Sequence, residues 1–433
     1  MRKNYFSKTF LLIAFSVLAA LPAVAQTFTN GVFVLNEGGF GSNNASVSFL
    51  ENGAAAATND IYTTVNPTQE ALGDTAQSIG FSGTYAYIVL NYSNTVKIVN
   101  RYTFEYVATI NQGLLNPRYI AFHGDKAYVT NWGDGASTTD DYVAVIDLAT
   151  NTITRNIPAA EGVERIITYN DKLYVAHYGG YGYGNTVSVI DTETDTIETI
   201  IPVGDVPNKL VVKDGFLYVL CGGNPGWSSE ETDGELVKIN LADDTVTAKI
   251  TYEGQHPGNL EIDADDNFYF SNEAKVYKGQ LSDNETVTEI ATLEPQGAYG
   301  IYSMALINNT LYVADAGDYV SPGTVYVFDT AGAAVSNYTV GVIPNGFYKA
   351  ESNLATPGFD KQALAVYPNP TTERFFVNTT ATPQISVYDI TGKMVLNTQY
   401  AATGVSIANL PQGMYMVKIA DNTTNTVKKL IIK

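Results

Sequence analysis

The chain has 433 residues and is acidic, with 24 Lys and Arg against 44 Asp and Glu, a formal net charge of −20. Nucleic acids and anionic membrane surfaces are therefore unfavourable partners, because they carry charge of the same sign. The single cysteine, Cys221, excludes an intramolecular disulfide, so the fold has to rest on its hydrophobic core.

Residues 1–25 are typical of a secretory signal peptide. Basic residues precede an apolar run, and the small residues Ala23-Val24-Ala25 mark a cleavage site before Gln26. No cysteine lies near this site, which argues against a lipid anchor, and we expect no transmembrane segment later in the chain. The sequence therefore predicts export.

Residues 26–350 repeat one strand pattern, an aromatic residue between aliphatic ones, as in AYV at 127–129 and LYV at 173–175. Spacings of 41 to 54 residues, with about four short strands in each unit, are typical of a β-propeller. Seven copies predict an all-β, seven-bladed propeller. The central aromatics are Phe33, Tyr87, Tyr128, Tyr174, Tyr218, Tyr269 and Tyr312.

The two ends of this array complement each other. The first unit begins at its second strand, GVFVLNEG at 31–38, and a spare first strand, GVIPNGFYKA at 341–350, follows the last unit. We therefore expect the C-terminal strand to complete blade one and close the ring, because closure removes exposed sheet edges.

The loops that follow the second strands are the longest, as in NWGDGASTTDD at 131–141 and HYGGYGYGN at 177–185. Long loops on one face mark the working face. A single aromatic side chain in these loops more often packs against a neighbouring blade. Several aromatic residues placed between glycines, with polar groups near them, favour capture of a planar or sugar-like molecule. The candidate ligand-binding residues are Phe40, Tyr92, Arg118, Trp132, Arg165, His177, Tyr178, Tyr181, Tyr183, Trp227, His256, Tyr299 and Tyr319, with Asn208, Lys209, Asn259 and Asn345 on the inter-blade connections.

A second candidate site is a polar ring on the propeller axis. Several second strands end in a polar residue, and such residues would hold an axial Ca²⁺ if they converged. Cys221 ends another second strand, with His177 one blade away. Cys221 could therefore act as a nucleophile, although such a residue is more often a small buried filler. No catalytic motif or zinc spacing accompanies them. The ring candidates are Asn36, Asn131, Asn272 and Asp315.

The hairpins DLATNTI at 147–153, DTETDTI at 191–197 and NLADDTV at 240–246, with the LYV strands, resemble YncE-like propeller repeats. The opening NEGGFGSNNASVSFLE at 36–51 is similar to that of an exported Bacteroidetes propeller family. The wider group includes BtuG-type surface propellers that capture corrinoids, and this chain departs from them in lacking a lipidated cysteine. The resemblance implies the propeller fold and leaves the ligand open.

Residues 351–363 are polar, contain Pro and Gly, and predict a linker. Residues 364–433 alternate short strands with turns, which predicts a small antiparallel β-sandwich. They also resemble the type A C-terminal sorting domain of the type IX secretion system, and this implies export across the outer membrane by that machinery. The matching residues are Tyr367, Pro368, Asn369, Pro370, Asp389, Gly392, Gly413, Tyr415, Lys428, Lys429 and Lys433.

Three function classes follow. The first is a surface or secreted propeller that captures a corrinoid, another cofactor or a glycan, with an outer-membrane TonB-dependent transporter as a candidate partner. The second is a metal-dependent enzyme of the lactonase, lyase or quinoprotein type. The third is an adhesion or scaffold module, which predicts a flat open face in place of a pocket.

Overall fold

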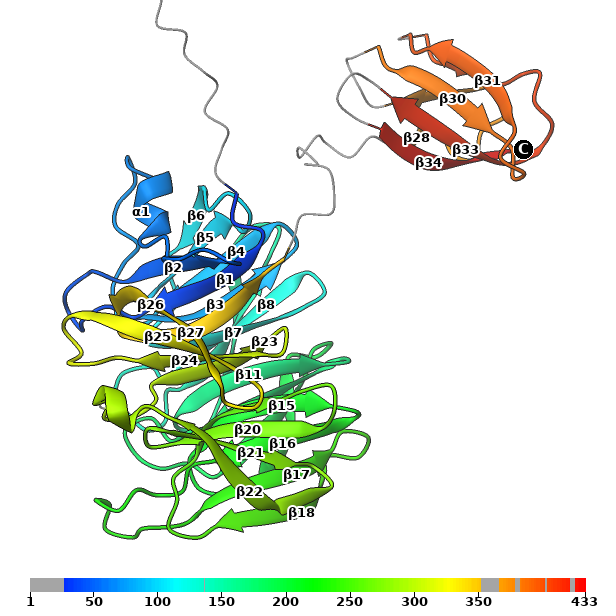
Figure 1. Cartoon of the computed structure of the whole chain (residues 1–433). Coiled ribbons are helices and arrows are strands. Elements are labelled where there is room, and N and C mark those ends of the chain that lie inside the picture. The colour runs from blue at the N-terminus through cyan, green and yellow to red at the C-terminus, as the bar shows by residue number, and fades with distance from the viewer. Residues whose placement is uncertain (1–26, 136, 352–365, 378–381, 402, 421–424) are drawn as a thin grey trace, which may run out of the picture. The chain divides into compact units, whose positions relative to one another are not determined.

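The structure is a computed structural model of the chain, and it describes residues 27–135, 137–351, 366–377, 382–401, 403–420 and 425–433 (Figure 1). The predicted signal peptide, residues 1–25, lies outside the described residues. So does the predicted linker, residues 351–363, apart from Glu351. The chain divides into two units, residues 1–352 and 353–433. The described residues of each unit enclose their own hydrophobic core.

The described residues of the first unit form seven antiparallel sheets, the blades of a propeller, whose inner strands contact one another around a ring. Strand order within each blade runs from the inner to the outer strand. Blade 1 contains β27 (Pro344–Ala350), β1 (Gly31–Asn36) and β2 (Ser46–Glu51); blade 2 contains β3 (Ala76–Ser82), β4 (Tyr85–Leu90), β5 (Thr95–Asn100) and β6 (Tyr106–Ile110); blade 3 contains β7 (Pro117–His123), β8 (Lys126–Asn131), β9 (Tyr142–Asp147) and β10 (Thr152–Pro158).

The remaining blades have the same order. Blade 4 contains β11 (Val163–Tyr169), β12 (Lys172–His177), β13 (Thr186–Asp191) and β14 (Thr196–Pro202); blade 5 contains β15 (Pro207–Lys213), β16 (Phe216–Cys221), β17 (Gly234–Asn240) and β18 (Thr245–Tyr252); blade 6 contains β19 (Gly258–Ile262), β20 (Asn267–Asn272), β21 (Lys275–Gln280) and β22 (Asp283–Thr292); blade 7 contains β23 (Ser303–Ile307), β24 (Thr310–Asp315), β25 (Pro322–Asp329) and β26 (Ala334–Val342). The short helices in the described chain are α1 (Ile61–Val65) and a 3₁₀ turn (Glu294–Gln296).

The ring closes as the sequence predicts. Strand β27 pairs antiparallel with β1, and Phe33 lies opposite Tyr348. Figure 1 shows this yellow strand beside the blue beginning of the propeller. An isolated bridge between Phe49 and Thr58 continues blade 1 on its outer side. The seven-bladed fold and its C-terminal closing strand are therefore confirmed.

The repeated aromatic residues are scaffold. Tyr128, Tyr174 and Tyr269 are fully buried, because each blade is covered by its neighbours on both faces. Tyr174 and Ala176 of blade 4 pack into one cluster with Leu217 and Val219 of blade 5. Burying one such side chain stabilises the fold by about 1.5–3 kcal/mol, which explains why the strand pattern recurs.

A polar clasp joins neighbouring blades at the base of the propeller, the face that carries the hairpins between third and fourth strands. The Tyr174 hydroxyl donates to Asp244 Oδ1 at 2.6 Å, and Lys172 Nζ lies 2.8 Å from Asp244 Oδ2. One blade earlier, the Tyr128 hydroxyl donates to Asp195 at 2.8 Å. Each aspartate belongs to the repeated outer hairpin of the next blade, so the hairpin motif also fastens blade to blade.

The second unit is the predicted β-sandwich. Its described residues form a three-stranded and a four-stranded sheet around Phe375, Val387, Val417 and Leu430. The strands are β28 (Val366–Tyr367), β29 (Arg374–Val377), β30 (Gln384–Tyr388), β31 (Met394–Gln399), β32 (Val405–Ser406), β33 (Gly413–Ala420) and β34 (Asn425–Ile432).

Several predicted sorting-motif residues shape this second unit. Asn369 accepts a hydrogen bond from the Ile431 amide at 2.9 Å and donates to Lys429 O at 2.8 Å, which fixes the segment after β28 to the last strand. Asp389 closes the turn that contains Gly392, whose φ is +84°. The Tyr415 hydroxyl donates to Pro411 O at 2.8 Å.

The remaining motif residues lie at the surface of the second unit. Tyr367 is half-exposed and stacks on Phe376, and Gly413 begins β33. Pro368, Pro370, Lys429 and Lys433 are exposed, and Lys428 is partly exposed. In the described parts of the chain, no helix combines the length and the apolar character needed to cross a membrane.

Candidate functional site

The site begins with an irregularity in the inner strands. At one end of the propeller, the pairing of first and second strands shifts register between Pro117 and Ile120 and between Val163 and Ile166. Matching shifts occur in blades 1, 2, 5 and 6 among the described strands. A bulge leaves residues out of the ladder and re-aims their side chains.

These bulged residues line a cavity of about 350 Å³, which we call the axial cavity because inner strands from several blades surround it. The face on which it opens, with the loops after the second strands, is called the mouth. The bulged residues in the wall are Gln77, Arg118, Tyr119, Glu164, Arg165, Asn208 and Asn345, and the adjoining loops add Glu37, Trp132, Tyr178 and Tyr302.

Arg118 is fixed in this wall by a bidentate ion pair. Its Nε and Nη2 lie 2.8 and 2.9 Å from the two carboxylate oxygens of Glu164, which is buried. Burial opposes the charge of Arg118, but Glu164 outweighs that effect and raises the pKa of the guanidinium. The guanidinium carbon also lies 4.0 Å from the ring centre of Trp132, so Arg118 positions the indole.

Glu37 brings a carboxylate from the first blade. It accepts hydrogen bonds from the Tyr302 hydroxyl at 2.9 Å and from Asn345 Nδ2 at 2.8 Å. Burial raises its pKa above the usual range, and these two donors only partly oppose that effect. Glu37 is thereby held between neutral donors, and it forms no ion pair within the described chain.

Arg165 is the cation of the cavity wall whose N–H donors are not all used. Its guanidinium carbon lies 4.0 Å from the ring centre of Tyr119, and its Nε donates to Asn208 O at 3.2 Å. Within the described residues, the ion pairs at this cavity involve Arg118 and Glu164 and leave Arg165 without a carboxylate. A guanidinium has five N–H donors, so Arg165 can still bind an anionic group.

Three buried polar atoms of the wall lack a hydrogen-bond partner in the described chain. They are Trp132 Nε1, Asn208 Oδ1 and Asn345 Oδ1. Leaving such an atom unsatisfied costs about 1–3 kcal/mol. The wall of the aromatic cavity therefore contains one donor and two acceptors that are closed off from solvent and could serve a polar guest if their side chains rotated toward it.

A second cavity of about 520 Å³, which we call the outer cavity, lies at the mouth beside blades 5 to 7. Trp227, His256 and Tyr299 line it, and both aromatic rings are almost fully exposed, at 87% and 93%. The Asn208 Nδ2 of the axial cavity donates to Pro257 O at 2.8 Å, next to Gly258 of the outer cavity. The two cavities are therefore neighbours.

The other predicted aromatics frame the mouth. Tyr181 lies edge-on to Trp132 at 5.8 Å, and Tyr319 lies edge-on to Tyr302 at the same distance. Phe40 contacts Tyr92 at 4.3 Å, away from both cavities. Tyr183 is half-exposed and lines neither. Among the connection residues, Asn259 lines the outer cavity, whereas Lys209 pairs with Glu261 at 2.9 Å.

One prediction for the mouth is corrected, and one open alternative is decided. His177 does not present its ring on this face: it is buried, with Nδ1 3.1 Å from Ala160 O and Nε2 2.8 Å from Ser188 Oγ. Burial lowers its pKa, so it is a neutral structural histidine. Burial raises the pKa of Cys221 to about 12, which excludes a ready thiolate and supports the small-filler interpretation.

The predicted polar ring also differs from the structure. Asn36 donates to Ser48 Oγ and Asn131 donates to Val129 O, so both serve their own blades. Asn272 accepts from the His256 amide, and Asp315 accepts from the Gly317 amide. These second strands lie one strand away from the axis, and none of the four residues lines the axial cavity. Among the described residues, no cluster of three or more His, Cys, Asp or Glu side chains suits a metal ion.

Sequence reasoning missed five residues of the axial cavity. They are Glu37, Gln77, Tyr119, Glu164 and Tyr302. Aligning the starts of the inner strands would have pointed to the bulged ones, because they occupy the same place as Arg118 and Asn345. Glu37 follows the end of β1 as Trp132 follows β8 and Tyr178 follows β12, so aligning the ends of the second strands would have pointed to it. Tyr302 stands directly before β23 and would have been found with the inner-strand starts.

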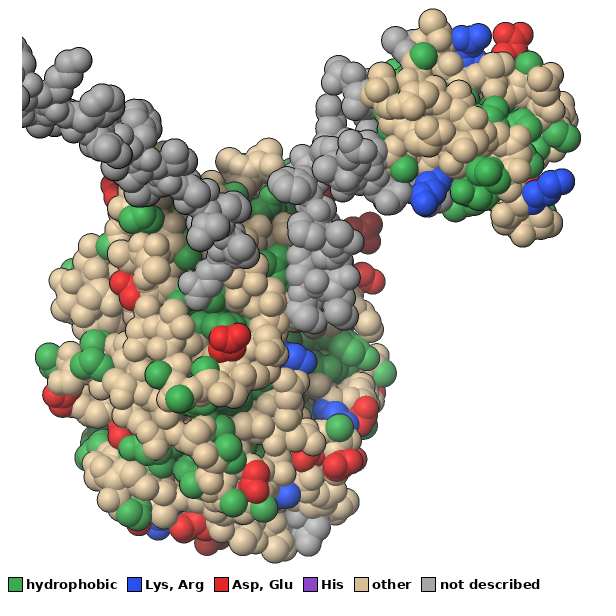
Figure 2. Space-filling model, turned by 45° about the horizontal axis from the view of Figure 1, so that its top comes forward, with side chains coloured by type: hydrophobic (Ala, Val, Ile, Leu, Met, Phe, Trp, Pro, Cys, Tyr) green, Lys and Arg blue, Asp and Glu red, His purple; other side chains and the backbone are tan. Residues whose placement is uncertain are grey.

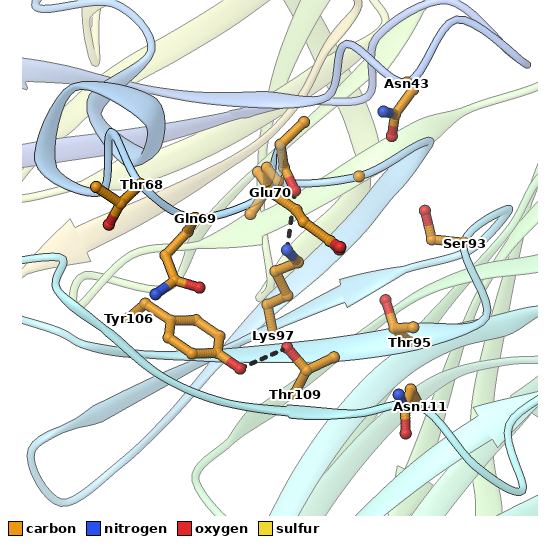
Figure 3. Close-up of a pocket in the computed structure, with 13 residues that line it drawn as sticks. Asn43, Thr68, Gln69, Glu70, Ser93, Thr95, Lys97, Tyr106, Thr109 and Asn111 are labelled. Carbon is orange, nitrogen blue, oxygen red and sulfur yellow. Dashed lines mark hydrogen bonds between the residues drawn. The ribbon is translucent and has the colours of Figure 1, made fainter.

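A third cavity, of about 660 Å³, lies at blade 2 (Figure 3). Lys97 Nζ in it donates to Ala71 O at 2.8 Å, and burial lowers the pKa of Lys97. Tyr106 and Thr109 are joined by their hydroxyls at 3.2 Å. Lys97 thus fastens the segment before β3, and we assign this cavity a structural role.

Charge on the visible surface is dispersed. Figure 2 shows basic side chains few and scattered among acidic and hydrophobic ones on the propeller face in view. This face offers no extended basic patch to a polyanion.

Two family comparisons cover the chain. The family described as a domain of unknown function, DUF5074, matches residues 30–348. The chain belongs to this family. Residues 365–433 match the secretion system C-terminal sorting domain. The second unit is therefore a type IX sorting domain, which engages that machinery and directs export to the cell surface or the extracellular space.

Solved structures confirm the propeller fold of this DUF5074 member. A functionally unknown protein from Desulfotomaculum acetoxidans has a TM-score of 0.53 at 14% identity, covering 75% of this chain and 100% of the other. Kuenenia stuttgartiensis hydrazine synthase has a TM-score of 0.52 at 16% identity, covering 64% and 92%. The Neurospora crassa Pan2 WD40 domain has a TM-score of 0.50 at 12% identity, covering 67% and 85%. No curated protein sequence matches the chain.

Proposed function

We propose that this secreted propeller captures a small molecule in the axial cavity. The ligand class is a planar or sugar-like ring that bears an anionic group. The observation that carries the proposal is the meeting of Arg165, which has no carboxylate partner among the described residues, with three unpartnered polar atoms at one aromatic cavity.

The chemistry of the wall defines this ligand. Trp132 and Tyr178 offer ring surface, and Arg165 offers the cation for the acidic group. Rotation of the Trp132, Asn208 and Asn345 side chains toward the ligand would let one donor and two acceptors that lack partners in the described chain bond hydroxyl or amide substituents. A cavity of about 350 Å³ accepts one ring or the protruding edge of a larger molecule.

The resemblance to BtuG-type propellers supports a corrinoid as one member of this class. A corrinoid is larger than the axial cavity, so only its edge would enter and the mouth aromatics would cover the rest. Capture would then precede uptake by an outer-membrane TonB-dependent transporter. The predicted signal peptide, residues 1–25, would start the export route that the sorting domain completes.

The two alternative functions have less support. A metal-dependent enzyme needs a converging ligand set, and the predicted ring residues bond within their own blades and loops. An adhesion module predicts a flat face, whereas this mouth is hollowed at two places.

Isothermal titration calorimetry of the full chain tests the proposal. The probes are benzoate, glucuronate and cyanocobalamin. We expect saturable binding of at least one probe, and Arg165→Gln should weaken it about tenfold or more, because a hydrogen bond to a charged group contributes about 1.5–3 kcal/mol.

The matched control is Arg155→Gln, the same change at an exposed residue of the outer strand β10. It should leave binding unchanged. Absence of saturable binding by all three probes, or equal binding by Arg165→Gln, would overturn the proposal.

A further inference from the structure

We infer that the outer cavity is a separate binding site for a neutral sugar chain. It is distinct from the axial cavity, shares no lining residue with it and contains the most exposed aromatic rings of the propeller mouth. The inference goes beyond the proposed capture of an anionic ligand, because another pocket and another chemistry carry it.

Two aromatic residues define the stacking surfaces of the outer cavity. Trp227 comes from the loop after β16, and Tyr299 comes from the connection between blades 6 and 7. Only 13% and 7% of their respective surfaces are covered, since their exposed fractions are 87% and 93%. Large apolar rings left this open at one pocket usually mark an interaction site. Rings that combine apolar faces with a polar edge suit the C–H faces of a sugar.

The floor of the cavity leaves room for such a ring. Gly254, Gly258 and Gly300 line it, and Gly254 has a φ of +63° that an L side chain rarely adopts. A Cβ at Gly254 would still meet nothing within 4 Å, so the space above it is open. The aromatic walls are therefore accessible to a ligand.

Polar groups at the same pocket match sugar hydroxyls. A contact of 2.9 Å between His256 Nδ1 and Gly222 O orients the imidazole ring. The other ring nitrogen, Nε2, lies 3.4 Å from Glu231 Oε1. Asn259 Nδ2 lies 2.9 Å from Ser271 Oγ, which holds the amide at the pocket. A few placed polar groups among aromatic walls are what a ligand pocket needs for orientation.

The charge of the pocket selects a neutral ligand. Glu273 lines the cavity, and Glu231 lies beside His256. Lysine and arginine are absent from the described lining of this pocket. An acidic sugar or a nucleotide would therefore meet like charge without a cation, whereas a neutral glycan would use these carboxylates as hydroxyl acceptors.

The two tryptophans allow the test, because the chain has only Trp132 and Trp227. In the full-length Trp132→Phe variant, all tryptophan fluorescence comes from the outer cavity. The probes are cellotetraose, xylotetraose and mannotetraose. We expect a saturable change in Trp227 emission with at least one of them, and about tenfold weaker binding after Tyr299→Ala, because aromatic anchors dominate such sites.

Controls keep the result specific. Ile200→Ala removes an exposed apolar side chain from the outer strand β14, away from both cavities, and should leave the affinity unchanged. Tetragalacturonate, an acidic chain of equal length, should bind at least about tenfold more weakly than the neutral sugar. Tyr299 is exposed, so its removal should leave the thermal midpoint unchanged.

The inference fails if none of the three neutral sugars changes Trp227 emission. It also fails if Tyr299→Ala binds as well as its parent, or if the acidic chain binds equally. The axial proposal is judged by calorimetry of Arg165→Gln with other probes. Failure of one site therefore leaves the result at the other site intact.

Discussion

The base and the mouth of the propeller use similar polar residues in opposite ways. At the base, Tyr174 and Lys172 of one blade bond Asp244 of the next, and Tyr128 repeats the arrangement with Asp195. At the mouth, the bulged position that lines the axial cavity is polar but varies in type. It is Gln77 in blade 2, Arg118 in blade 3, Glu164 in blade 4, and asparagine in blades 5 and 1, Asn208 and Asn345.

This difference shows where the repeat is constrained. The clasp recurs at the interfaces between blades 3 and 4 and between blades 4 and 5, where a tyrosine of one blade bonds an aspartate of the next. In blade 6, the equivalent Tyr269 hydroxyl bonds Asp263 of its own blade. A bulged side chain leaves the ladder and faces the axial cavity, so its identity is free to vary with the ligand. Repetition thus marks scaffold, and variation within a repeated frame marks the candidate site.

The substitution expected to weaken the base of the propeller most is Asp244→Ala. The change leaves the buried Tyr174 hydroxyl without its acceptor and removes one partner of Lys172. We expect a loss of about 2–3 kcal/mol, the cost of a lost charged hydrogen bond and an unsatisfied buried donor. Urea unfolding followed by circular dichroism measures it.

Asp243→Ala is the matched control for that experiment. Asp243 is exposed and bonds Thr245 within its own hairpin, so its removal should cost less than about 0.5 kcal/mol. Equal unfolding midpoints for the two variants would show that the clasp does not hold blades together.

The same contrast explains what the sequence could predict. The anchors Tyr128 and Tyr174 recur, and with the spare strand at 341–350 they were enough for the seven-bladed closed fold. Arg118 and Arg165 were predicted from their place on the connections between blades. Glu164 was missed although it occupies in blade 4 the bulged position that Arg118 has in blade 3. Its ion pair with Arg118 joins two blades and cannot be read from local sequence.

Solvent exposure was the other unpredictable property. His177 ends β12 where Asn131 ends β8, and both are buried, whereas the residues that follow them, Tyr178 and Trp132, both line the axial cavity. The predicted exposure of His177 was wrong because its ring bonds Ser188 of its own blade. The residue type alone does not reveal that contact.

Asp141 tests whether the mouth also contains scaffold. It is buried and accepts the Gly162 amide at 2.7 Å, which ties a mouth loop of blade 3 to blade 4. Burial raises its pKa to about 6 from 3.8. The pKa of Asp141 is higher in the folded than in the unfolded chain, so proton binding by Asp141 stabilises the fold. This stabilisation is full below about pH 4 and is lost as the pH rises through about 6.

Lowering the pH from 7.5 to 5 should therefore stabilise the parent chain through Asp141 by about 1 kcal/mol. Asp141→Asn removes this component, so the stability difference between the two chains should change by that amount over the interval. Thermal midpoints at both pH values measure the difference. If the stability of both chains responds identically to pH, Asp141 does not titrate in this range.

Only a small loss of stability is expected at Arg165, and it gives the clearest distinction between scaffold and binding site. Arg165→Gln removes a guanidinium that stacks on Tyr119 and donates one hydrogen bond to Asn208 O. No buried carboxylate of the described chain loses its partner, so the loss of stability should be only about 0.5–1 kcal/mol, the size of a cation–π contact. The same variant should lose at least about tenfold in ligand affinity. Urea unfolding and calorimetry on one preparation separate the two effects, and a loss as large as that of Asp244→Ala would make Arg165 part of the scaffold instead of the site.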